Sequence, residues 1–171
     1  MSRLPSSATL VHLPMAVSVF LDAERSEIVD AAVAQLGRAH ARHYEAAGEL
    51  EQRRRIEALF DDVRNAVARR QLGSILEGAR SIARERYSAG YDLSEVQTAF
   101  NALEESVWHA TFLHAQPAQY SEILGLTTTV LGAAKDALAR EYVSLATRSQ
   151  APSLDVTALF AGTERESTSA R

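Results

Sequence analysis

The most informative feature of this chain is an apolar seam that follows a helix-starting signal. Asp92 and Glu95 stand three residues apart, the spacing of an N-terminal capping pair, in which each side chain accepts a hydrogen bond from the other residue's backbone N–H. After this pair, apolar residues recur every three or four positions and form one stripe on a helix: Leu93, Val96, Phe100, Leu103, Val107 and Ala110. A stripe of this length must be buried against other helices, so the pattern predicts a helical bundle.

The rest of the chain continues the helical pattern, and no region alternates apolar and polar residues over the length of a strand. We predict an all-α, globin-like or helical-bundle domain of about five helices at residues 15–147. A flexible N-terminus (1–14) precedes it, and a mostly disordered tail (148–171) follows. The expected helices span roughly 15–46, 49–70, 72–89, 92–115 and 117–147, with a break near Asp22–Arg25. Gly48 and Gly90 are expected to end helices, Gly90 in the left-handed conformation.

Charge and composition exclude several classes of protein. The net charge of −4 argues against a general nucleic-acid binder, and the lack of cysteine excludes disulfides, thiolate metal sites and cysteine nucleophiles. The apolar run at Leu10–Leu21 is interrupted by His12 and Pro14, and no run reaches the ~18 apolar residues of a membrane span. We therefore expect a cytoplasmic protein that binds neither membranes nor nucleic acid.

The histidines are the main candidates for a cofactor or metal site. His40 and His43 lie three residues apart, but no second cluster is spaced to complete a metal site, and a structural role is favoured. Glu105 and His109 are four residues apart, whereas di-iron bundles use Glu-x-x-His in two copies. His114 continues the seam four residues after Ala110, so it is expected to point inward. We therefore predict no metal and no cofactor, with haem at His109 or His114 as the alternative.

No sequence motif predicts catalysis. The chain contains no GxGxxG, GxxxxGK[ST], HExxH or GxSxG pattern. Adjacent carboxylates such as Asp61–Asp62 point about a hundred degrees apart on a helix and cannot form an acid–base pair. The basic run at Arg53–Arg55 is interpreted as a solvated helix face. We predict that the protein is not an enzyme.

Two apolar features are candidates for partner binding. Trp108 is the only tryptophan and lies one position off the seam, where it either packs at the edge of the core or belongs to an interface. The tail carries a short apolar patch at residues 154–160 that has too few turns to form a stable helix alone. Its predicted contact residues are Leu154, Val156, Leu159 and Phe160.

The segment Ala79–Trp108 resembles the N-terminal sensory domain of the RsbT co-antagonist (RsbR-type) proteins of bacterial stress signalling. The likeness is carried by the Gly-x-Asp-Leu-x-Glu-Val-Gln core (Gly90–Gln97), by Leu124–Ala146 and by the tail segment Leu154–Thr163. It covers roughly residues 20–163. The resemblance implies an all-helical sensory domain that is usually dimeric and does not itself catalyse a reaction.

These observations lead to one main functional hypothesis and one alternative. The main hypothesis is a non-catalytic regulatory domain that forms a homodimer and binds a regulatory protein partner. The alternative is a sensor that holds haem or another small apolar molecule between its helices. The sequence leaves open which signal or partner is recognised.

Overall fold

The computed structural model describes residues 16–39 and 41–150, and this part of the chain contains seven α-helices, one 3₁₀ turn and no β-strand. In chain order these elements are α1 (Val17–Ala23), α2 (Arg25–Arg38), α3 (Arg42–Ala47), α4 (Glu49–Arg69), α5 (Gly73–Ser88), α6 (Leu93–His114), η1 (Pro117–Gln119) and α7 (Tyr120–Gln150). The predicted all-α class is confirmed. Within these residues no helix is both long enough and apolar enough to cross a membrane.

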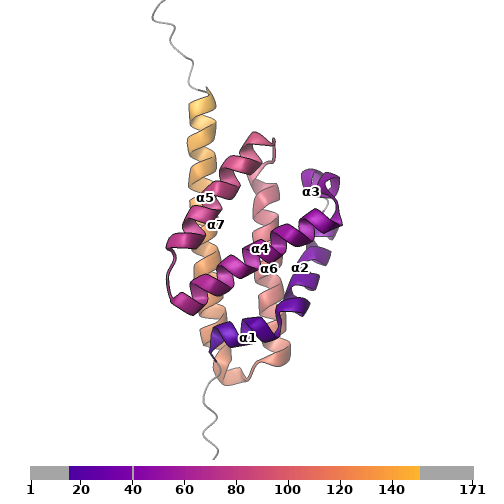
Figure 1. The fold of residues 1–171 in the computed structure, drawn as a ribbon, viewed down its shortest axis with the longest axis vertical. Helices are drawn as coiled ribbons and strands as arrows, with labels where there is room; N and C mark the ends of the chain where they lie inside the picture. Colours follow the sequence, from indigo (N-terminus) through magenta and orange to yellow (C-terminus); the bar gives the residue numbers. More distant parts are fainter. Residues whose placement is uncertain (1–15, 40, 151–171) are drawn as a thin grey trace, which may run out of the picture.

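The two longest helices, α6 and α7, form the spine of the bundle (Figure 1). They are joined by the η1 turn and run side by side in opposite directions. Helix α2 packs on α6, and α5 packs along α7. Helix α4 crosses over these helices diagonally and contacts each of them, while α1 packs against α4 at one end of the molecule.

The first predicted helix is divided into three. The break expected near Asp22–Arg25 is present at Glu24, where the backbone leaves helical geometry between α1 and α2. A second interruption, between α2 and α3, was not expected because residues 39–41 contain neither proline nor glycine. Ala41 there has extended backbone (φ −75°, ψ 104°). This bend turns α3 inward and buries Tyr44.

The remaining helix ends follow the sequence signals closely. Gly48 and Gly90 both have φ of +81°, a conformation that favours glycine. Asp92 and Glu95 form the predicted capping box at the start of α6. Pro117 begins the 3₁₀ turn that leads into α7, and α7 continues to Gln150 rather than ending near Thr147.

Within residues 16–39 and 41–150, one apolar core connects the seven helices, from Val17 in α1 to Tyr142 in α7. The α6 seam is buried as predicted, except that Leu93 at its start is half-buried. The inward faces expected for the other helices also lie in this core, including Ile56 and Phe60 of α4 and Leu131 and Leu138 of α7. Periodicity therefore predicts the core of the bundle well.

Candidate functional site

The two histidines predicted as alternative haem contacts lie at the surface. His109 is exposed, and the His114 side chain is 39% exposed at the last position of α6. The expectation that His114 points inward is wrong because the α1–α2 junction beside it presents carboxylates rather than apolar side chains. Its Nε2 lies 3.0 Å from Glu27 and 3.9 Å from Glu24. Haem binding through either histidine remains a prediction from the sequence.

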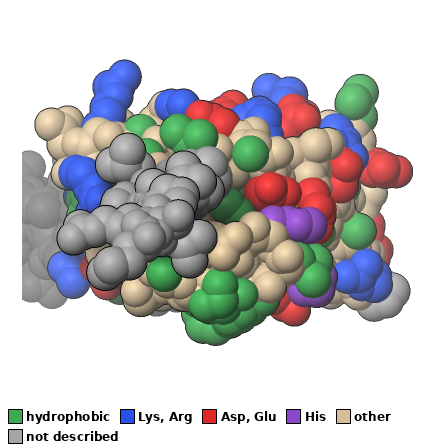
Figure 2. All heavy atoms as spheres, turned by 90° about the horizontal axis from the view of Figure 1, so that it is seen from below, with side chains coloured by type: hydrophobic (Ala, Val, Ile, Leu, Met, Phe, Trp, Pro, Cys, Tyr) green, Lys and Arg blue, Asp and Glu red, His purple; other side chains and the backbone are tan. Residues whose placement is uncertain are grey.

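His114, Glu24 and Glu27 form a surface cluster whose potential ligand atoms lie within 4.8 Å of one another. The view onto the α1 end of the molecule shows a histidine among acidic side chains (Figure 2). Imidazole and carboxylate are donor types that divalent metals accept. The His114 ring contacts both carboxylates, so the three side chains form a small polar cluster at the surface.

His43 has a structural position, as predicted, but for a different reason. It lies in the first turn of α3 rather than near the end of a long helix. Its Nδ1 is 2.7 Å from the Glu95 carboxylate, and its ring stacks on Tyr91 with 4.6 Å between ring centroids. These contacts fasten α3 to the start of α6. His40 lies outside the described residues.

Next to this contact, arginine and tyrosine side chains from several helices form a polar cluster inside the bundle. Arg55 of α4 donates from Nη1 to the Tyr91 hydroxyl over 2.8 Å, and that hydroxyl donates to the His43 carbonyl oxygen over 3.3 Å. The guanidinium groups of Arg55 and Arg86 both lie against the Tyr91 ring, 5.7 and 5.4 Å from its centroid. Such cation–π contacts stabilise partly desolvated cations. Burial raises the pKa of the Tyr44 hydroxyl, although the positive charges of Arg86 and Arg55 oppose this shift.

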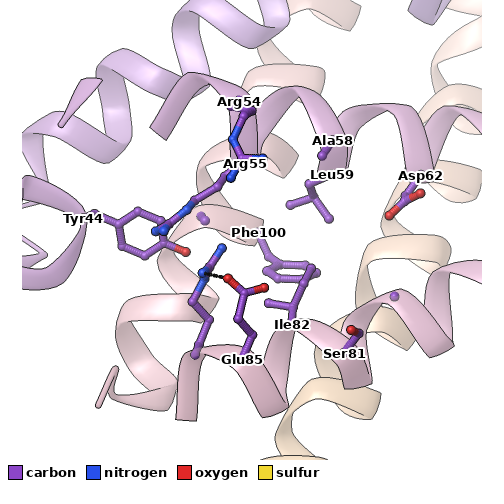
Figure 3. Close-up of a pocket in the computed structure, with 13 residues that line it drawn as sticks. Tyr44, Arg54, Arg55, Ala58, Leu59, Asp62, Ser81, Ile82, Glu85 and Phe100 are labelled. Atoms are coloured by element: carbon purple, nitrogen blue, oxygen red, sulfur yellow. Dashed lines mark hydrogen bonds and ion pairs between the residues drawn. The ribbon is translucent and has the colours of Figure 1, made fainter. Parts of the chain in front are cut away.

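A pocket of about 340 Å³ opens beside this cluster, between α4 and α5 (Figure 3). Its floor is apolar, and its polar wall contains the side chains of three arginines. Burial, with a contribution from the negative charge of Asp61, raises the pKa of Asp62 at its edge. The residues that line it include Tyr44, Arg54, Arg55, Leu59, Asp62, Ser81, Ile82, Glu85, Arg86 and Phe100.

The second notable surface lies on α6, where three large apolar side chains face solvent. Trp108 is 43% exposed, Phe112 53% and Leu113 57%. We call these three residues the α6 apolar face. Trp108 and Phe112 also line a groove of about 580 Å³ between α6 and α2, together with Ala31 and Ala34.

The sequence singles out one residue of this arrangement. Trp108 is partly exposed on a groove, and its predicted contact with a partner stays a prediction. The tail residues Leu154, Val156, Leu159 and Phe160 lie outside the described residues, so their predicted contact role stays a prediction. The polar pocket was missed, although one signal was present. Arg86 falls three residues after Ala83 and seven after Ala79, on the buried side of α5.

Comparison with known proteins connects this fold to one family. The family model of the RsbT co-antagonist protein RsbRD N-terminal domain matches residues 7–155. The chain belongs to this family. RsbRD N-terminal domains are regulatory domains of stress signalling, and the resemblance seen in the sequence is thereby confirmed. No curated protein and no solved structure matches the chain.

Proposed function

We propose that this RsbRD N-terminal domain is a non-catalytic regulatory module that acts in the cytoplasm through protein–protein binding. In this proposal the α6 apolar face is the contact surface, and the first partner is a second copy of the chain. The homodimer would then bind a regulatory protein of the RsbT pathway. Family membership supports the regulatory role.

The observation that carries the proposal is the exposure of Trp108, Phe112 and Leu113 within six residues of one helix. Aromatic residues are enriched in protein interfaces, and several large apolar side chains exposed close together mark an interaction site more often than single scattered ones do. Figure 2, a space-filling view from the end of the molecule where α1 lies, shows hydrophobic side chains gathered at one edge.

The neighbouring groove gives this surface a shape that a partner side chain can fill. Ala31 and Ala34 of α2 are small, so the groove between α2 and α6 is hollow. Arg38 and Glu105 also line it and supply opposite charges. An apolar centre with charged groups at its edge is the usual organisation of a protein interface.

The proposal is tested by measuring the mass of the protein in solution by size-exclusion chromatography with light scattering. We expect the wild type to be a dimer and the Trp108→Glu/Leu113→Glu variant to be a monomer, because a carboxylate buried in an apolar contact loses its hydration. The matched control is Leu50→Glu, which changes an 84% exposed leucine on α4. This control should remain dimeric.

Two results would contradict the proposal. One is a wild-type protein that stays monomeric across the accessible concentration range, together with a Trp108→Glu/Leu113→Glu variant that binds the regulatory protein as tightly as the wild type does. The other is a dimer that persists in the double variant. Far-UV circular dichroism of each variant separates loss of binding from loss of fold.

A further inference from the structure

Arg86 is a buried cation whose hydrogen bonds are incomplete. The residue is 7% exposed, and its Nη1 donates to the Glu85 carboxylate over 2.6 Å, the contact drawn as a dashed line in Figure 3. Among the described residues its Nε has no hydrogen-bond partner. A buried guanidinium normally has every N–H paired, because a donor without an acceptor loses its hydrogen bonds to water. The contact with the Tyr91 ring partly compensates the Arg86 charge, but Nε still lacks an acceptor among the described residues.

Arg86 lines the pocket between α4 and α5, which is the free volume next to its side chain. The other two arginines of this wall are already occupied. Arg54 and Arg55 both donate to Glu51, from Nε over 2.7 Å in each case. They add positive charge near the pocket, while Arg86 retains the unpaired donor.

The pocket also limits the size and charge of what could fill it. Leu59, Ile82 and Phe100 provide an apolar floor, and a volume of about 340 Å³ is at the lower end of small-molecule sites. Asp62 and Glu85 place carboxyl groups on the same walls, which disfavours a ligand with two negative charges. A single negative charge attached to a small apolar body fits both features.

We propose that this pocket binds a small organic monocarboxylate. Its carboxylate pairs with the Arg86 guanidinium, whose side chain rotates to bring the enclosed Nε to the pocket, and its hydrocarbon body lies against Phe100, Ile82 and Leu59. Guanidinium and carboxylate are matched in geometry, and their charge-assisted hydrogen bonds are roughly twice as strong as neutral ones. The inference does not depend on the α6 apolar face, so either proposal can fail without the other.

The experiment measures binding of benzoate and hexanoate to the full chain by isothermal titration calorimetry, with benzamide and inorganic phosphate as comparison ligands. Two variants address the pocket. Arg86→Gln removes the donor, and Ser81→Leu keeps every charge but adds bulk from an exposed position of α5 that lines the pocket. Arg140→Gln is the control, because this arginine is on α7, is exposed and pairs with Asp136.

We expect one of the two carboxylates to bind with 1:1 stoichiometry and benzamide to bind at least about tenfold more weakly than benzoate. Ser81→Leu and Arg86→Gln should each weaken carboxylate binding by about tenfold or more, and Arg140→Gln should leave it unchanged. If Arg86→Gln does not fold, Ser81→Leu alone decides the matter. The proposal is overturned if neither carboxylate binds at about 10 mM, if Ser81→Leu binds as the wild type does, or if phosphate binds more tightly than both.

Discussion

At the scale of single residues, Glu95 joins α3 to the start of α6 through one carboxylate. It accepts hydrogen bonds from the backbone N–H groups of His43 and Asp92, both over 3.1 Å, and it contacts the His43 ring. Burial acts to raise the pKa of this carboxyl, but the two backbone N–H groups and the His43 side chain outweigh burial, and the net shift is downward. The carboxylate form is therefore favoured by folding.

We expect Glu95→Gln to lower the free energy of unfolding by about 1–3 kcal/mol at neutral pH, because a neutral amide replaces a charged acceptor. The folded state binds the Glu95 proton less tightly than the unfolded state, so this stabilisation is present above the unfolded pKa of about 4.3 and is lost as pH falls through the lowered folded pKa. Urea denaturation between neutral and acid pH should show wild type and variant converging.

The control for this prediction is Glu122→Gln, which removes an exposed ion pair with Arg70. Exposed pairs contribute little, so its effect should stay below about 1 kcal/mol. A pH-independent difference between wild type and Glu95→Gln would show that the substitution disturbs packing and that the charge is not the cause.

At the scale of helices, a pair of glycines isolates the effect of backbone conformation. Gly90 ends α5 with φ of +81°, and a Cβ placed there would meet only His43 Nε2 at 3.9 Å, an ordinary contact. Gly132 lies inside α7, and a Cβ there meets nothing within 4 Å. Neither position is crowded, so the two differ in backbone geometry alone.

Gly90→Ala and Gly132→Ala should therefore change stability in opposite directions. Alanine at position 90 is held in a left-handed conformation, and the free energy of unfolding should fall by about 1–2 kcal/mol. Alanine at position 132 reduces the entropy of the unfolded chain, and stability should rise by about 0.5–1 kcal/mol. Chemical denaturation of both variants checks this. A stabilised Gly90→Ala would contradict the assigned turn.

The helices also show which features a sequence alone can predict. The Asp92–Glu95 cap, the glycine stops and the α6 seam depend on residues close together in the chain, and all were predicted. The bend at Ala41 was not, because alanine carries no signal for it and the residues that contact Tyr44 after the bend, Arg55 and Tyr91, are distant in sequence.

The pocket escaped prediction for the same reason. Tyr44, Arg55 and Arg86 are far apart in sequence and meet only when α3, α4 and α5 are packed. The run Arg53–Arg55 was interpreted as a solvated face, which fits Arg53 and Arg54, whereas the Arg55 side chain is 17% exposed and lies against Tyr44 and Tyr91. Periodicity alone gives no indication of which arginines find aromatic partners.

At the scale of the whole molecule, the helices of the described residues share one apolar core. It extends from Val17 to Tyr142, and α7 runs along the full length of the bundle (Figure 1). Each of the seven helices contributes at least one buried residue to it. The described part of the chain thus contains the elements that a stable domain requires.

Removing residues 151–171 should consequently leave the fold intact. We expect the truncated protein to keep its helical circular dichroism and to unfold within about 0.5 kcal/mol of the full chain. Leu131→Ala, which empties a fully buried position in α7, should by contrast cost about 2–5 kcal/mol. If the tail patch at 154–160 contacts a partner, as its sequence predicts, truncation weakens partner binding while stability is retained. A truncated chain as unstable as Leu131→Ala would instead assign residues beyond 150 to the core.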